Sequence, residues 1–176
     1  MAERDWVKVV AEQVCEQCGY AGSTVAPEAL ADGLRAEADG WADLLGATPD
    51  DQLRVRDGDT WSALEYAAHT RDTLAVFAGR VGRMLEEDDP QLGWWDHEAA
   101  AVDERYNEQD PAAVGLALVA NAEALALALE GVDAAAWHRT GMRRAGERFT
   151  VEGLGRFALH EARHHRVDAE GASRRA

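Results

Sequence analysis

Four long stretches of this chain carry apolar side chains at helical spacing, and this periodicity constrains the fold more than any other feature. The stretches cover about residues 27–46, 60–87, 110–131 and 150–170. Residues three and four apart lie on one face of a helix, so each stretch would bury one stripe. Four such helices in one domain pack as a bundle. The sequence therefore predicts an all-α protein with a four-helix bundle.

Start and stop signals support these helices. Ser62 with Glu65 forms a capping-box pattern, and Asp110 precedes a first-turn proline. Thr150 is a good N-cap, and Gly131 ends the third stretch. We expect a short helix within residues 88–109 and a turn or small hairpin within residues 132–149. The expected organisation is an N-terminal segment over residues 1–26, a bundle over 27–170 and a tail over 171–176.

Charge and composition exclude several classes of protein. The chain has 176 residues, enough for one domain, and a formal net charge of -15. This charge argues against nucleic acid and against anionic membranes as partners.

We find no signal peptide and no apolar run that approaches the roughly 20 residues of a membrane span. We expect a cytoplasmic protein with a small-molecule substrate. The oligomeric state stays open, with a homodimer as one candidate.

Histidines in the last helical stretch indicate a metal site. His160 and His164 are four residues apart, so their imidazoles lie on one helix face and can share a metal ion. A third histidine, His69, lies in the second helical stretch. Taken alone, His69 is better explained as a partly exposed residue at the edge of the core than as a ligand. Three protein ligands with one open position are typical of a catalytic metal site.

The same helix carries more inward-facing polarity than a plain core stripe allows. On a helical wheel, Glu161, His165 and Asp168 point inward with the histidine pair, while the arginines of this helix point outward. Buried polar groups need partners, and a metal with its surrounding hydrogen bonds would satisfy several. Glu161 or His165 could move a proton, and Asp168 could orient an imidazole. The alternative for all three is a packing role.

Residues 160–164 also match H-E-x-x-H, the pattern of zinc metalloproteases. In that class the third ligand lies downstream of the motif, and its extended form needs glycine and histidine at fixed offsets. Those offsets carry Val167 and Glu170 here, and only twelve residues follow His164. The match is therefore set aside.

Cys15 and Cys18 form a C-x-x-C pair near the start of the chain. The pair looks like half of a zinc ribbon, but a ribbon needs a second pair and the chain has only these two cysteines. We expect two reduced thiols, with a metal site or a disulfide as the alternatives.

The connections between helices supply candidate pocket residues. Trp94, Trp95 and His97 could line a substrate pocket, or they could cover the core beneath a long loop. Arg139 and Arg143 could hold an anionic cosubstrate, or they could balance nearby carboxylates.

Two motifs resemble those of a known family. Residues 61–72, WSALEYAAHTRD, resemble the second-helix motif of the DinB-like (damage-inducible) metalloenzymes, roughly W-S-x-x-E-x-x-x-H-x-x-D. Residues 159–168, LHEARHHRVD, resemble the fourth-helix motif with its H-x-x-x-H-H pattern. Residues 137–146 also look like the segment that precedes that helix. The resemblance covers most of the chain.

The resemblance implies an up-down-down-up four-helix bundle and a divalent metal ion, most often zinc or nickel. Its ligands carry over to His69, His160 and His164, although some members have Glu in place of one ligand. Characterised relatives are transferases or isomerases that use a low-molecular-weight thiol such as mycothiol, bacillithiol or glutathione. The expected function is therefore a metal-dependent thiol S-transferase. The alternatives are a stress-linked metal-binding bundle without catalysis and a metal-dependent hydrolase.

Overall fold

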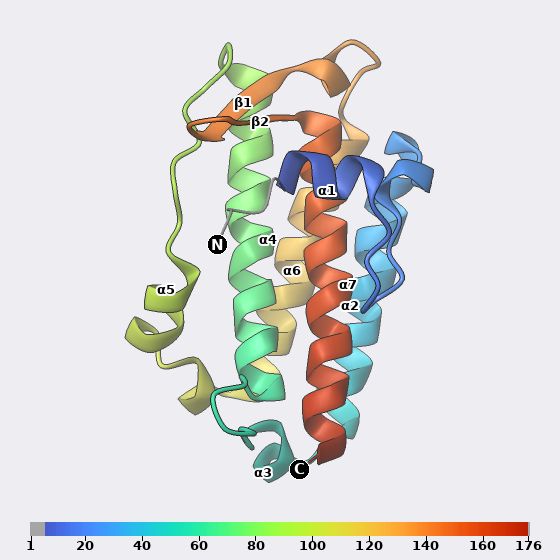
Figure 1. Cartoon of the computed structure of the whole chain (residues 1–176). Coiled ribbons are helices and arrows are strands. Elements are labelled where there is room, and N and C mark those ends of the chain that lie inside the picture. The colour runs from blue at the N-terminus through green and yellow to red at the C-terminus, as the bar shows by residue number, and fades with distance from the viewer. Residues whose placement is uncertain (1–5, 176) are drawn as a thin grey trace.

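The computed structural model describes residues 6–175, so residues 1–5 of the N-terminal segment and residue 176 of the expected tail lie outside it. The described chain is mostly helical, with one small two-stranded sheet (Figure 1). Its helices and strands are α1 (Trp6–Glu12), α2 (Leu30–Ala47), α3 (Asp50–Leu53), α4 (Ala63–Glu86), α5 (His97–Asp103), α6 (Pro111–Glu130), β1 (Thr140–Arg144), β2 (Glu147–Thr150) and α7 (Val151–Arg175). The four long helices α2, α4, α6 and α7 pack around one core, which bears out the expected helical bundle.

The predicted helix starts are confirmed. The Ser62 hydroxyl accepts a hydrogen bond from the Glu65 backbone N–H at 3.2 Å, and the Glu65 carboxylate accepts one from the Ser62 N–H at 2.9 Å. Asp110 caps α6 through the Ala112 N–H, and Thr150 accepts a hydrogen bond from the Gly153 N–H. These caps satisfy backbone donors that have no partner inside the helix.

The helices begin at different ends of the bundle. The Ser62 hydroxyl donates to the side chain of Asn107 at 2.7 Å, which puts the starts of α4 and α6 at one end. At the other end, a Cβ on Gly155 would meet Leu30 and Leu129, so the starts of α2 and α7 lie beside the end of α6. The long connection between α4 and α6 therefore returns along the bundle (Figure 1).

The connection from α6 to α7 is the expected small hairpin. Strands β1 and β2 pair antiparallel, and Gly146 has a φ of +83° in the turn between them. Gly141 lies so close to Met84 and Leu92 that a Cβ there would clash with both. The hairpin can therefore close over the end of α4, beside the N-terminus of α7.

Helix α7 continues past the expected tail boundary. It runs to Arg175 and so includes Gly171, the first residue of the tail expected over 171–176. Ala169 and Ala172 are buried on either side of that glycine. Packing of these alanines offsets the roughly 1 kcal/mol that glycine costs in a helix interior.

The expectation that no segment is apolar enough to span a membrane is wrong for helix α6. By length and composition alone, Pro111–Glu130 passes that test, with a mean hydropathy of 1.9. It packs between α2 and α4, and its residues Val114, Leu118 and Leu125 belong to the core. Only its inward face is buried, because Leu116 and Leu127 on the outward face are exposed.

Candidate metal centre

Two helices bring one carboxylate and two imidazoles together at the middle of the bundle. His69 comes from α4, and Glu161 and His165 come from successive turns of α7. Each residue offers one ligand atom, and these atoms all lie within 4.8 Å of one another. The ring centroids of His69 and His165 are 4.7 Å apart in an edge-to-face arrangement. We call His69, Glu161 and His165 the α4–α7 cluster.

Burial sets the charge state of His69. Its side chain is 4% exposed, and its Nδ1 atom has no hydrogen-bond partner among the described residues. Desolvation lowers the pKa of His69 to about 3, with the positive charge of His165 adding to the effect. His69 is therefore a neutral imidazole, the form that binds a metal ion.

Glu161 and His165 form a charged pair. Burial by itself would raise the pKa of Glu161, but the hydrogen bond and charge of His165 outweigh it and lower this pKa to about 2. Burial likewise opposes the charge on His165, yet hydrogen bonds to Asp168 and Glu161 raise its pKa to about 9. The two side chains approach at 3.5 Å. A bound cation would take the place of the proton on His165.

The α4–α7 cluster fits a divalent metal ion. Two imidazole nitrogens and a carboxylate oxygen are a donor set that zinc accepts, at about 2.0–2.2 Å from the ion. The carboxylate of Asp168 lies 3.2 Å from Nδ1 of His165, where it can orient the ring as a hydrogen-bonded carboxylate does around metal-bound histidine. The orphaned nitrogen of buried His69 gives an independent reason for a ligand at this point.

The ligand set that the resemblance implied differs from this grouping. His69 lies in the α4–α7 cluster, but His160 and His164 do not join it. The ligand atoms of those two histidines group instead with Cys15 and Cys18, again within 4.8 Å of one another. Residues 160 and 161 are about 100° apart around the helix, so α7 presents one i, i+4 pair to α4 and the other to the N-terminal segment.

Aromatic side chains surround the α4–α7 cluster on its open side. A cavity of about 270 Å³ is lined by all three members of the cluster and by Trp61, Trp94, Trp95 and His97. Trp95 stacks on His69 with ring centroids 5.7 Å apart, and His97 lies 5.4 Å from the same ring. Residues 94, 95 and 97 therefore line a pocket beside the cluster, as the first of the two sequence interpretations proposed.

The two predicted arginines have different places. Arg143 lines this cavity and packs against Trp94, with its guanidinium 5.5 Å from the ring centroid. It also pairs with the buried carboxylate of Glu147 at 2.7 Å, so the interpretation that it balances a nearby carboxylate holds. Arg139 is not among the cavity's lining residues. Its guanidinium donates to the carbonyl oxygens of Met84 and Glu87 at 2.6 and 2.7 Å, where it caps the C-terminus of α4.

Arg80 is a pocket residue that sequence analysis did not select. It lines the cavity, is 6% exposed, and donates to the carbonyl oxygen of Gly93 at 2.8 Å. Among the described residues, its Nε has no hydrogen-bond partner and no carboxylate forms an ion pair with it. Burial, and then the charge of Arg143, lower the pKa of Arg80 to about 10. The available signal was its spacing: residues 69, 73 and 80 share one buried face of α4.

Comparisons with known proteins agree with this architecture. The family model of the DinB superfamily matches residues 33–168, and the chain belongs to that superfamily. Among solved structures, the chain is similar to YfiT from Bacillus subtilis, with 19% sequence identity and a TM-score of 0.77. The match covers 86% of this chain and 90% of that one. YfiT is described as a probable metal-dependent hydrolase with an unusual four-helix bundle topology. A comparison with curated proteins gives no significant match.

Proposed function

We propose that this protein is a divalent-metal-dependent enzyme whose ion is held by His69, Glu161 and His165. The observation that carries the proposal is the convergence of these three donors beside an aromatic cavity. A Glu in the ligand set agrees with the DinB-like members that carry Glu in place of one histidine. The positions of the helix ends support the up-down-down-up order, in which α4 and α7 pack against each other and run in opposite directions.

We further propose that the reaction transfers a low-molecular-weight thiol to a small electrophile. Zinc or nickel at this point would supply a Lewis acid that holds a thiol deprotonated at neutral pH. Asp168 can orient the ring of His165, while Trp61 and Trp95 pack against the ring of His69. The cytoplasm is the expected place of action because its thiols are kept reduced.

Arginines define the substrate class. Arg80 and Arg143 line the cavity with guanidinium groups. Arg143 already pairs with the carboxylate of Glu147 at 2.7 Å, whereas Arg80 has no ion-pair partner among the described residues. A buried guanidinium costs free energy unless an anion accompanies it. We therefore assign to Arg80 the binding of a carboxylate on the thiol or on the electrophile.

A hydrolase is the second candidate. The solved structure of similar fold is described as a probable metal-dependent hydrolase, and a metal ion can lower the pKa of bound water to about 7. A metal-binding bundle without catalysis is the third candidate. All three candidates bind the same ion. The first two differ in the reaction that they catalyse, and the third catalyses none.

Turnover assays separate these candidates. Zinc- and nickel-loaded protein is mixed with a panel of carboxylate-bearing electrophiles, with and without mycothiol, bacillithiol or glutathione. We expect conjugation that needs both the thiol and the metal. A parallel panel of esters and amides without thiol tests hydrolysis. Hydrolysis without thiol conjugation would contradict the transferase and support the hydrolase. Metal binding without turnover on either panel would support the bundle without catalysis.

Arg80→Met should raise the KM for an anionic substrate more than it lowers kcat. Losing one buried charge-assisted contact costs about 1.5–3 kcal/mol, or roughly 10- to 100-fold in kcat/KM. Arg80→Lys, which keeps the charge, should recover part of the loss. Arg139→Met is a matched control, because Arg139 caps α4 outside the cavity. Equal losses for the Arg80 and Arg139 variants would contradict this assignment.

A further inference from the structure

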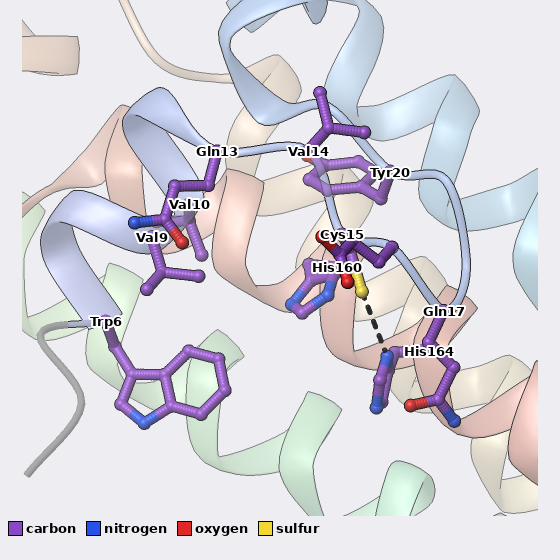
Figure 2. A pocket seen from close by; sticks show the side chains of 11 residues that line it. Trp6, Val9, Val10, Gln13, Val14, Cys15, Gln17, Tyr20, His160 and His164 are labelled. Carbon is purple, nitrogen blue, oxygen red and sulfur yellow. Dashed lines mark hydrogen bonds between the residues drawn. The ribbon is translucent and has the colours of Figure 1, made fainter.

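Cys15 and Cys18 meet His160 and His164 on the face of α7 next to the one that carries the α4–α7 cluster. One ligand atom from each of the four residues lies within 4.8 Å of the others. The Cys15 thiol is 3.5 Å from Nδ1 of His164, and Figure 2 shows both histidines directed toward the loop that carries this cysteine. We propose a second, structural zinc site formed by these four residues.

The ligand types and spacings are those of a closed zinc site. Structural zinc is held by four ligands in a tetrahedron, and Cys₂His₂ sets combine C-x₂₋₄-C with H-x₃₋₅-H. This chain has two residues between its cysteines and three between its histidines. The sequence holds no second cysteine pair that would complete a ribbon. The fold completes the set with histidines that are about 140 residues further along the chain.

The backbone around the cysteines is a tight turn that aims both thiols at α7. The Cys15 N–H donates to the carbonyl oxygen of Tyr20, and the Gly19 N–H donates to that of Cys15, both at 2.8 Å. Gly19 has a φ of +69°, which glycine adopts without strain. The turn is therefore fixed by its own hydrogen bonds before any ion is considered.

Polar contacts anchor this turn to α7 around the four ligands. Gln17 donates a hydrogen bond to Asp168, and Arg163 donates to the carbonyl oxygen of Cys18 at 3.1 Å. The carboxylate of Asp168 also lies 3.6 Å from Nε2 of His164. A carboxylate beside a ligand histidine is the usual surrounding of a bound zinc ion. Asp168 thus touches a histidine of each proposed site, His164 here and His165 in the α4–α7 cluster.

The site has both an enclosed interior and an entry path. His160 is 4% exposed and Cys18 is 8% exposed, so two of the four ligands are buried, while Cys15 and His164 are partly exposed. A cavity of about 460 Å³ between α1 and the turn reaches Cys15, His160 and His164, and through it an ion can enter (Figure 2). Binding would convert two thiols to thiolates and release their two protons to solvent, with no change in oxidation state.

The ion would hold the N-terminal segment against the bundle. Helix α1 packs across α7, and Trp6 stacks on Phe157 with ring centroids 5.2 Å apart (Figure 1). Trp6 lines both the cavity at the cysteines and the cavity at the α4–α7 cluster. A zinc ion at Cys15 and Cys18 would therefore keep one wall of the substrate pocket in place.

Cobalt substitution tests this site without altering the protein. Chelator-treated, reduced full-length protein is titrated with Co²⁺ alone. We expect a thiolate-to-cobalt charge-transfer absorption that saturates at one thiolate-bound ion per chain and disappears when Zn²⁺ is added. Titration without this absorption would overturn the proposal, as would isolation of the untreated protein with a Cys15–Cys18 disulfide in place of the ion.

Two variants separate this site from the α4–α7 cluster. Cys15→Ser with Cys18→Ser should abolish the thiolate absorption, reduce bound metal by one ion per chain, and speed tryptic cleavage after Lys8. Glu161→Gln with His165→Ala should keep the absorption and lose the other ion. Loss of the absorption in the second variant would refute an independent site. If the wild type shows the absorption but the cysteine variant retains no ion, the α4–α7 cluster binds no metal. That outcome refutes the proposed function and leaves the cysteine site supported.

Discussion

Replacing Glu161 by Gln and His165 by Ala together should empty the α4–α7 cluster of its ion and reduce metal-dependent turnover to background. These residues supply two of the three donors, and His69 alone offers one nitrogen at this point. The loss in affinity should exceed the roughly 10- to 100-fold that changes around a ligand shell cost. Metal analysis after dialysis measures the stoichiometry, and turnover is measured on the same preparation.

Two controls make the outcome specific. His138→Ala removes an exposed histidine in the α6–α7 connection and should change neither quantity. His160→Ala with His164→Ala should leave the ion of the α4–α7 cluster bound, because the structure groups those histidines with the cysteines. If the His160 and His164 variant loses that ion while Glu161→Gln with His165→Ala keeps it, the ligand set that the resemblance implied is the correct one.

Trp41→Ala should destabilise the protein by about 3–5 kcal/mol, the cost of truncating a large buried aromatic side chain. Trp41 is fully buried on α2, and its indole N–H donates to the carbonyl oxygen of Ala162 at 3.0 Å. Ala162 follows Glu161 directly, so this tryptophan also fixes the turn of α7 that carries the α4–α7 cluster. Chemical denaturation measures the free energy of unfolding.

Comparison variants test whether burial causes that loss. Trp41→Phe keeps most of the volume but loses the hydrogen bond, and should cost less than Trp41→Ala. Trp94→Ala removes the same ring from a side chain that is 55% exposed, and should change stability by less than about 1 kcal/mol. Equal effects at positions 41 and 94 would show that the α2–α7 contact does not stabilise the bundle as described.

Local signals in the sequence were sufficient to locate the four long helices, but not the short helices α1 and α3. The capping box at Ser62 and Glu65 and the Asp110 cap depend on residues that are neighbours in the chain, and each appears in the structure. The end of α7 was not predictable in this way. Gly171 reads as a stop, but burial of Ala169 and Ala172, which depends on tertiary packing, keeps the helix intact.

The sequence allowed us to predict which residues are functional, but not which of them lie together in one site. His69, Glu161 and His165 were all selected as functional residues, the last two as proton carriers. A sequence gives the 100° offset between neighbouring positions, but the rotation of α7 against α4 is decided by packing, for example by Trp41 on Ala162. Arg80 was missed because an arginine at the edge of an apolar face looks exposed until the 88–96 connection covers it.

Anomalous X-ray diffraction from crystals of the untreated protein, recorded at the absorption edge of the bound metal, locates the ion. We expect a peak about 2.0–2.2 Å from one atom each of His69, Glu161 and His165. A peak coordinated by His69 together with His160 and His164, or no peak beside His69 in metal-loaded crystals, would contradict this ligand set.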